Sequence, residues 1–249
     1  MENTLLIGLS RQVALARELD VIANNMANVN TNGFKARSSR FEEYVDPDAS
    51  IETFPWPDRD LSYVIDAGTP IDLSDGAAEP TGNPLDVAIR GEAFFTVQTP
   101  AGERYTRNGA FQIDPQGRLV TSDGFPVMGD GGQIQLEPGD TDIVIAADGS
   151  ISTRQGARGR IALVRFDQPE LLSNVGANLF APLEPAQAPV AAGAAARVEQ
   201  GFVERSNVRA VYEMTRLMEV SRAYTRIAST LSSLTDLQRT AIRTLGEAA

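Results

Sequence analysis

The feature that most constrains this chain is a long apolar repeat near its C-terminal end. Between residues 205 and 245, apolar and small residues recur in steps of three and four. This period predicts an amphipathic helix, and a spacing near 3.5 residues favours packing against another helix in a coiled coil. At about 1.5 Å per residue the helix would reach roughly 60 Å. The residues that we expect to pack between subunits here are Met214, Leu217, Tyr224, Ile227, Leu231 and Leu234.

A second amphipathic helix is predicted at the other end of the chain, over residues 3–28. Its expected packing residues are Leu5, Leu9, Leu19, Ile22 and Met26. Asn residues then crowd the chain, and an Asn-Gly pair follows at 32–33, which predicts a helix stop and a turn. An apolar stripe of this length must be buried. We therefore expect residues 1–34 and 205–249 to form one antiparallel coiled-coil domain, with surplus apolar surface for neighbouring subunits.

The centre of the chain has a different period. Short runs rich in β-branched and aromatic residues alternate with Gly, Pro and Asp turns, which predicts a compact antiparallel β domain, a sandwich or a barrel, over residues 81–180. Residues 35–80 are predicted to be an extended or irregular connector, and residues 181–204 a return linker. The predicted fold class is α+β, with terminal helices flanking an all-β centre.

Composition excludes several function classes. The chain has no Cys and no His, which removes disulfides, His-based catalytic dyads and Cys- or His-based zinc sites. A net charge of −11 argues against a nucleic-acid partner. Neither a membrane-spanning segment nor a cleaved signal peptide is expected from the sequence. We expect no cofactor, no metal and no enzymatic activity.

Several motifs allow more than one interpretation. The Asn-rich turn contains Asn24, Asn25, Asn28, Asn30, Gly33 and Phe34. It is equally compatible with an ordinary helix stop and with a fixed turn whose amides bond the backbone. The Gly-rich segment 129–132 favours a hairpin over a phosphate or calcium site, because the Walker lysine and the acidic ladder are missing. The single Trp, Trp56, could belong to a core or anchor a partner.

Four segments, in order along the chain, carry a resemblance to a known family. They are Ala23-Asn24-Asn25-Met26-Ala27-Asn28 with Asn30-Thr31-Asn32-Gly33-Phe34-Lys35, residues 81–89 followed by 94–97, residues 105–111 followed by 117–121, and residues 200–208. Together they resemble the flagellar rod and hook family of bacteria. Within it, the chain is most similar to the proximal-rod member, and the alternative is the distal-rod member or another axial protein of the family.

This resemblance implies a structural role without catalysis or cofactor. It implies polymerisation through the terminal helices, transmission of torque from motor to hook, and partners that are copies of the chain itself, adjacent proximal-rod proteins and the distal-rod protein. It also implies uncleaved export by the flagellar type III apparatus into a rod that spans the periplasm. Two other classes stay open on the residues alone: a secreted carbohydrate-active enzyme, and a binding module with a coiled-coil handle.

Overall fold

The computed structural model describes residues 2–46, 61–183, 188–193 and 196–247. Trp56 and parts of the two predicted connecting segments lie outside the described residues. The chain divides into two compact units. We call Met1–Ala27, Arg37–Pro70 and Arg209–Ala249 the helical unit, and Asn28–Ala36 with Ile71–Val208 the β unit.

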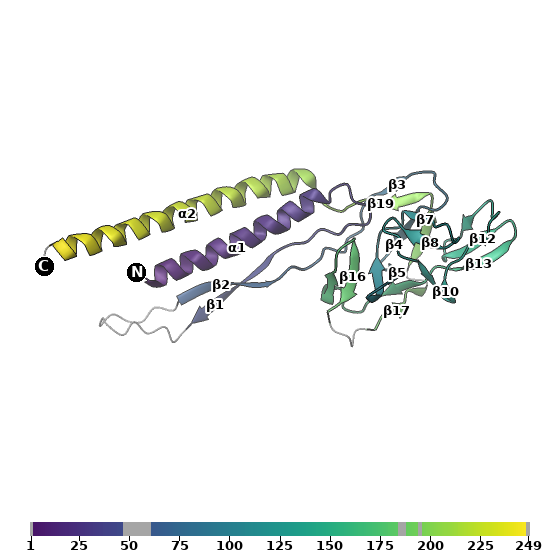
Figure 1. Cartoon of the computed structure of the whole chain (residues 1–249), viewed down its shortest axis with the longest axis horizontal. Coiled ribbons are helices and arrows are strands. Elements are labelled where there is room, and N and C mark those ends of the chain that lie inside the picture. The colour runs from purple at the N-terminus through teal and green to yellow at the C-terminus, as the bar shows by residue number, and fades with distance from the viewer. Residues whose placement is uncertain (1, 47–60, 184–187, 194–195, 248–249) are drawn as a thin grey trace. The chain divides into compact units, whose positions relative to one another are not determined.

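The helical unit contains both terminal helices and one hairpin. Helix α1 covers Glu2–Ala27 and helix α2 covers Ala210–Glu247. Strands β1 (Arg40–Asp46) and β2 (Leu61–Gly68) pair antiparallel, and β2 lies against α1 (Figure 1). This hairpin lies in the segment that was predicted to be a connector. Helices α1 and α2 confirm the two helices that were predicted at the ends of the chain. Within the described residues, neither helix is long and apolar enough to cross a membrane.

The β unit contains all other strands, and every strand pair in it is antiparallel. A six-stranded sheet has the order β15-β16-β6-β5-β14-β17, and smaller ladders accompany it. The prediction of a largely β centre is confirmed. The strands are β3 (Ala78–Pro80), β4 (Val87–Arg90), β5 (Phe94–Thr99), β6 (Gly102–Thr106), β7 (Phe111–Ile113), β8 (Leu119–Thr121), β9 (Met128–Gly129), β10 (Gly132–Gln133), β11 (Val144–Ile145), β12 (Ser150–Thr153), β13 (Gly156–Arg160), β14 (Leu163–Arg165), β15 (Leu172–Asn174), β16 (Leu179–Pro182), β17 (Val190–Ala191), β18 (Arg197–Gln200) and β19 (Phe202–Glu204), with a 3-10 turn at Pro169–Leu171.

Strand β5 separates two hydrophobic clusters, because successive side chains of a strand point to opposite faces. Phe95 belongs to the larger cluster and meets Phe111 edge to face, with ring centroids 5.0 Å apart. Phe94 belongs to a smaller aromatic cluster and meets Phe166 and Phe180 in the same way. Both faces of this strand are buried, which explains why its sequence does not alternate strictly between apolar and polar residues.

Candidate functional site

The two helices of the helical unit pack against each other and run in opposite directions. Near the start of α1, a Cβ on Gly8 would lie 2.6 Å from Cδ2 of Leu231, so the leucine fills the space that the glycine leaves. Near the end of α1, the Asn25 amide donates to the Glu213 carboxylate at 3.1 Å. Between these points, Glu18 forms an ion pair with Arg216. Early residues of α1 therefore meet late residues of α2, and the helices run antiparallel.

The predicted packing residues of the two helices differ in their exposure. Ile22 is buried, and Leu9 and Met214 are more than half exposed. Half-buried side chains make up the rest: Leu5, Leu19, Met26, Leu217, Tyr224, Ile227, Leu231 and Leu234. The predicted stripes therefore contain one set of side chains that is at least partly covered inside the unit and a second set that is open to solvent.

Asn25 is the member of the Asn-rich motif that the helical unit buries most completely. Its amide nitrogen donates to the Arg37 carbonyl at 2.8 Å, and its amide oxygen accepts from the Arg37 N–H at 2.9 Å. With its third hydrogen bond, to Glu213, the side chain joins α1, α2 and the start of the hairpin segment. Asn24 is exposed on the same helix. In this unit, position 25 therefore acts as a fixed connection rather than as a simple helix stop.

Burial raises the pKa of the Glu213 carboxyl above its ordinary value of 4.5, although the Asn25 hydrogen bond and the Arg216 charge act in the opposite direction. The folded state then binds this proton more tightly than the unfolded state. Stability that depends on Glu213 is therefore greatest at acid pH and is lost as the pH rises from about 4.5 through the raised native pKa.

Replacing Glu213 by Gln should flatten this pH dependence and stabilise the helical unit at neutral pH. The neutral amide keeps an acceptor for Asn25 and removes the cost of burying a charge. Thermal melts followed by helical circular dichroism between pH 4 and 8 would measure the effect. Glu219→Gln, on the exposed face of α2, is the matched control and should leave the profile unchanged. A variant profile that still falls with pH as in the parent chain would contradict the assignment.

The rest of the Asn-rich motif folds into the β unit as a tight turn. The Thr31 N–H donates to the Asn28 carbonyl at 3.1 Å, and Asn30 is exposed at the tip. Gly33 has φ of +66°, and its N–H donates to the Glu204 carbonyl at 2.7 Å. Phe34, with 4% exposure, is buried. The motif is thus shared between a helix end in one unit and a turn held by β19 in the other.

Next to this turn lies a charge cluster, which we define as Lys35, Asp75, Arg107 and Glu204; Asp75 is exposed at its edge, and the other three side chains are buried. Lys35 Nζ is 2.7 Å from Oε1 of Glu204, and Arg107 Nε is 2.9 Å from Oε2 of the same carboxylate. Arg107 also meets Asp75 at 2.7 Å through Nη2. Lys35, Arg107 and Glu204 are each 2% exposed. One carboxylate therefore joins two buried cations that come from distant parts of the chain.

The remaining polar atoms of the cluster find backbone partners. Arg107 Nη1 donates to the carbonyls of Gly91 and Ala93, each at 2.6 Å, and Lys35 donates to the Ser74 carbonyl at 2.7 Å. Burial, helped by repulsion from Arg107, lowers the pKa of Lys35, while Glu204 and Asp75 oppose that shift. A buried ion pair is tolerated only when its hydrogen bonds are satisfied in this way.

The sequence analysis did not identify this cluster as a site. The three buried members each lie in a separate motif that carries the family resemblance, at residues 30–35, 105–111 and 200–208. The available signal was the presence of Lys35, Arg107 and Glu204 inside three motifs that are otherwise rich in Asn, Gly and apolar residues, although Arg205 follows Glu204 directly. The structure brings these motifs together around one carboxylate.

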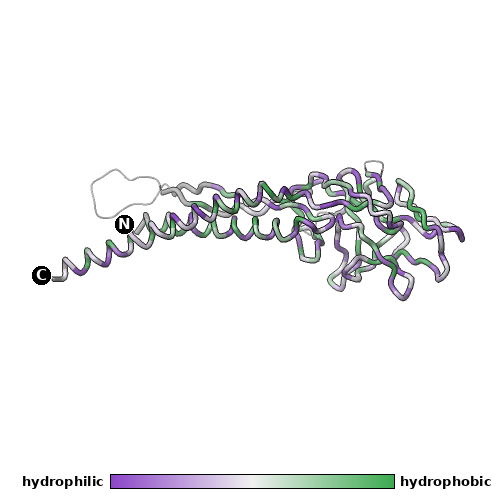
Figure 2. Tube along the Cα trace, turned by 90° about the horizontal axis from the view of Figure 1, so that it is seen from above, coloured by the Kyte–Doolittle hydropathy of each residue, from purple (hydrophilic) through white to green (hydrophobic). Residues whose placement is uncertain are grey.

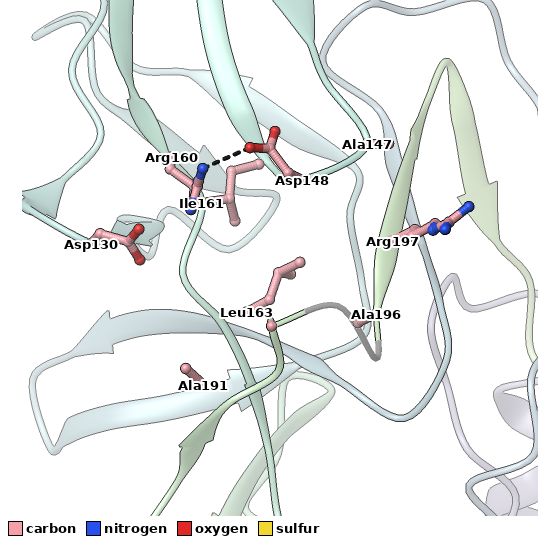
Figure 3. Close-up of a pocket in the computed structure, with 10 residues that line it drawn as sticks. Asp130, Ala147, Asp148, Arg160, Ile161, Leu163, Ala191, Ala196 and Arg197 are labelled. Carbon is pink, nitrogen blue, oxygen red and sulfur yellow. Dashed lines mark hydrogen bonds and ion pairs between the residues drawn. The ribbon is translucent and has the colours of Figure 1, made fainter.

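A separate pocket of about 450 Å³ lies in the β unit. It is lined by the apolar side chains of Ile161 and Leu163 and by the charged side chains of Asp130, Asp148 and Arg197, among others (Figure 3). Arg160 holds Asp148 in an ion pair at 2.7 Å. Asp130 and Asp148 are the carboxylates among the described residues that line this pocket, and Asp148 is paired. The lining therefore lacks the two unpaired carboxylates that glycoside hydrolysis uses. No group of metal-binding side chains occurs among the described residues either.

Comparison with known proteins finds family models that match both ends of the chain and part of the β unit. Three family models match: a flagella basal body rod protein model at residues 5–35, a flagellar hook protein FlgE/F/G D1 domain model at 88–153, and a flagellar basal body rod FlgEFG C-terminal model at 199–244. A basal-body rod protein FlgF of Caulobacter vibrioides is 39% identical over 99% of both chains. The chain belongs to the flagellar basal-body rod protein family, in its FlgF branch.

Other relatives in the rod family agree with this assignment. FlgF of Mesorhizobium japonicum is 37% identical over 99% of both chains. FlgG of Bacillus subtilis is 32% identical over 90% of this chain and 92% of its own length. As a member of a structural family rather than an enzyme family, the chain is a structural subunit of the flagellar basal-body rod.

Proposed function

We propose that this rod subunit polymerises through its terminal helices, which form the inner layer of the rod and transmit torque from motor to hook. The observation that carries the proposal is the arrangement of α1 and α2. The helices pair through contacts such as Gly8 with Leu231, and still leave large apolar side chains exposed. Exposed apolar stripes promote association. The pair then works as an antiparallel coiled coil with a second surface for neighbours.

The proposed place of the subunit is the proximal rod, and the distal rod is the alternative. Its proposed partners are other copies of the chain, adjacent proximal-rod proteins and the distal-rod protein FlgG. Export through the flagellar type III apparatus without a cleaved signal would bring it to the periplasmic rod. Ordering of the helices on docking would delay polymerisation until after export, since segments that fold on binding associate only when a partner is present.

Replacing Leu231 by Asp should abolish incorporation into the rod while the β unit keeps its fold. The charge would lie against Gly8 in the helix pair, where water cannot solvate it fully. Motility in soft agar and immunoblots of isolated basal bodies would measure incorporation. Near-ultraviolet circular dichroism of the purified variant would show whether the aromatic clusters of the β unit remain packed. Leu19→Asp, on α1, should behave in the same way.

Ser233→Asp, an exposed position on the same helix, is the matched control and should leave swimming unchanged. Swimming cells with normal basal bodies that contain Leu231→Asp would contradict the proposed role of the helices. Loss of the near-ultraviolet signal in Leu231→Asp would direct the test to Leu19→Asp.

A further inference from the structure

The last two strands of the β unit pair with its first two strands. Strand β19 forms a two-stranded sheet with β3, and β18 forms another with β4 (Figure 1). In these ladders Val203 lies opposite Glu79, and Val198 lies opposite Ile89. Pairing of positions so far apart in the sequence closes a long loop and costs chain entropy, which the contacts that it makes must offset. We call residues 197–207, which contain β18 and β19, the closing strap.

The closing strap also holds the segments that come earliest in the β unit. The Gly33 N–H donates to the Glu204 carbonyl at 2.7 Å, and the Gly76 N–H donates to Oε1 of the Glu204 side chain at 2.9 Å. Asn207 Oδ1 accepts from the Ala36 N–H at 2.7 Å. The Asn-rich turn and the chain that leads into β3 therefore both take hydrogen-bond partners from the closing strap.

The closing strap contributes to the core of the β unit as well. Val198 and Val203 are 3% and 4% exposed, and Val198 belongs to the larger hydrophobic cluster together with Val87 and Ile89 of β4. Figure 2 shows that the apolar residues of the β unit are spread over short runs along the chain. The core is therefore assembled from many segments, and the closing strap supplies one of the last of them.

Without the closing strap, the cations of the charge cluster would lose the carboxylate that they share. Glu204 pairs with both Lys35 and Arg107, and both cations are buried. A buried ion whose partner is removed leaves an uncompensated charge in a region that water does not reach, which strongly destabilises a fold. The earlier strands thus lack their ladder partners, part of their core and a counter-charge until the closing strap is in place.

We propose that the rest of the β unit does not stay folded unless the closing strap is docked. Ladder pairing, core packing and charge neutralisation all depend on this one short segment. Because small domains unfold cooperatively, loss of its contacts also opens strands with which it does not pair. Strands β5 and β6 are such strands, since they pair with each other and with β14 and β16.

The closing strap also sets when the β unit can fold. Its strands are the last of the unit in the sequence, so they come last in a chain that is made or threaded from its N-terminus. The β unit then folds in one step, once residue 207 is available, rather than strand by strand. For the export proposed above, this order would prevent folding of the unit part-way through passage. That consequence rests on the proposed function, whereas the folding order does not.

A reversible block at one position tests the closing strap in the full chain. The chain has no Cys, so Val203→Cys carries a single thiol, to which glutathione can be joined as a mixed disulfide in urea. The bulky charged adduct cannot be buried where Val203 lies. After removal of urea, we expect loss of the near-ultraviolet circular dichroism of the aromatic clusters and at least tenfold faster hydrogen exchange in β5 and β6. Reduction with dithiothreitol should restore both signals.

Two control positions show whether the effect belongs to the closing strap. Arg197→Cys, at an exposed position of the strap, should keep both signals with the same adduct. Ile151→Cys is a buried position on β12, which pairs with β11 and β13. Its adduct should open that three-stranded sheet and leave β5 and β6 protected. Val198→Cys, on β18, repeats the test if the thiol form of Val203→Cys does not fold.

Two outcomes would overturn the proposal. If β5 and β6 keep their protection with the adduct at position 203, the closing strap stabilises only its own ladders. If the adduct at position 151 opens β5 and β6 to the same extent, any buried adduct suffices and the strap has no special part. Neither outcome bears on the rod role of the helices, which is measured by incorporation into basal bodies.

Discussion

Replacing Glu204 by Gln should lower the free energy of unfolding of the β unit by about 3–5 kcal/mol, the range seen when one partner of a buried ion pair is removed. Glu204 accepts from Lys35 and Arg107, and all three side chains are 1–3% exposed. The amide would leave two buried cations facing each other with only Asp75 to compensate. Urea denaturation of the full chain, followed by near-ultraviolet circular dichroism, would measure the loss.

The chain offers a matched control for this experiment on a neighbouring strand. Glu199 forms an ion pair with Arg90 at 3.1 Å, but both side chains are more than two-fifths exposed. Solvent screens such pairs, so Glu199→Gln should cost less than about 1 kcal/mol. Equal losses of stability in the two variants would mean that burial does not increase the contribution of the cluster's ion pairs. The double variant Lys35→Met with Glu204→Leu should recover part of the lost stability. It removes the buried lysine charge together with the carboxylate that pairs with it.

Replacing Gly33 by Ala should destabilise the β unit by about 3 kcal/mol or more, since backbone strain and overpacking each cost about 1–3 kcal/mol. Gly33 has φ of +66°, a region that side chains other than Gly disfavour. An added Cβ would lie 2.4 Å from the backbone carbon of Arg107 and 2.4 Å from the backbone nitrogen of Asn108. These are backbone atoms, so no side-chain movement relieves the clash. The same urea denaturation would measure the effect.

Gly131→Ala is the control for this second prediction. Gly131 has no neighbour within 4 Å of an added Cβ and no positive φ. Alanine there should be neutral or should stabilise slightly, by reducing the freedom of the unfolded chain. A Gly33→Ala chain as stable as the Gly131→Ala chain would contradict the packing of the turn against residues 107 and 108. A displaced turn would also move Lys35 away from Glu204.

Much of the architecture follows from local patterns. The stripes at Leu19 and Ile22 and at Leu217 and Leu231 predicted both helices, because a 3.6-residue period is visible within any few turns. Turn residues between short apolar runs predicted the β centre in the same way. The hairpin of β1 and β2 was not predicted, because its pairing joins positions on either side of residues 47–60 and no short run signals it.

The sequence by itself determined the two amphipathic helices, the β centre and the Asn-Gly turn, since each depends on residues a few positions apart. Only the tertiary structure decided that Lys35, Arg107 and Glu204 meet, because these contacts join positions 97 to 169 residues apart. It also decided which apolar residues of each stripe stay exposed. Periodicity assigns a side chain to a face of its helix, but only the partner's position determines whether Leu9 is covered while Ile22 is buried. The burial of a side chain depends on both surfaces that meet, and the sequence of one helix describes only one of them.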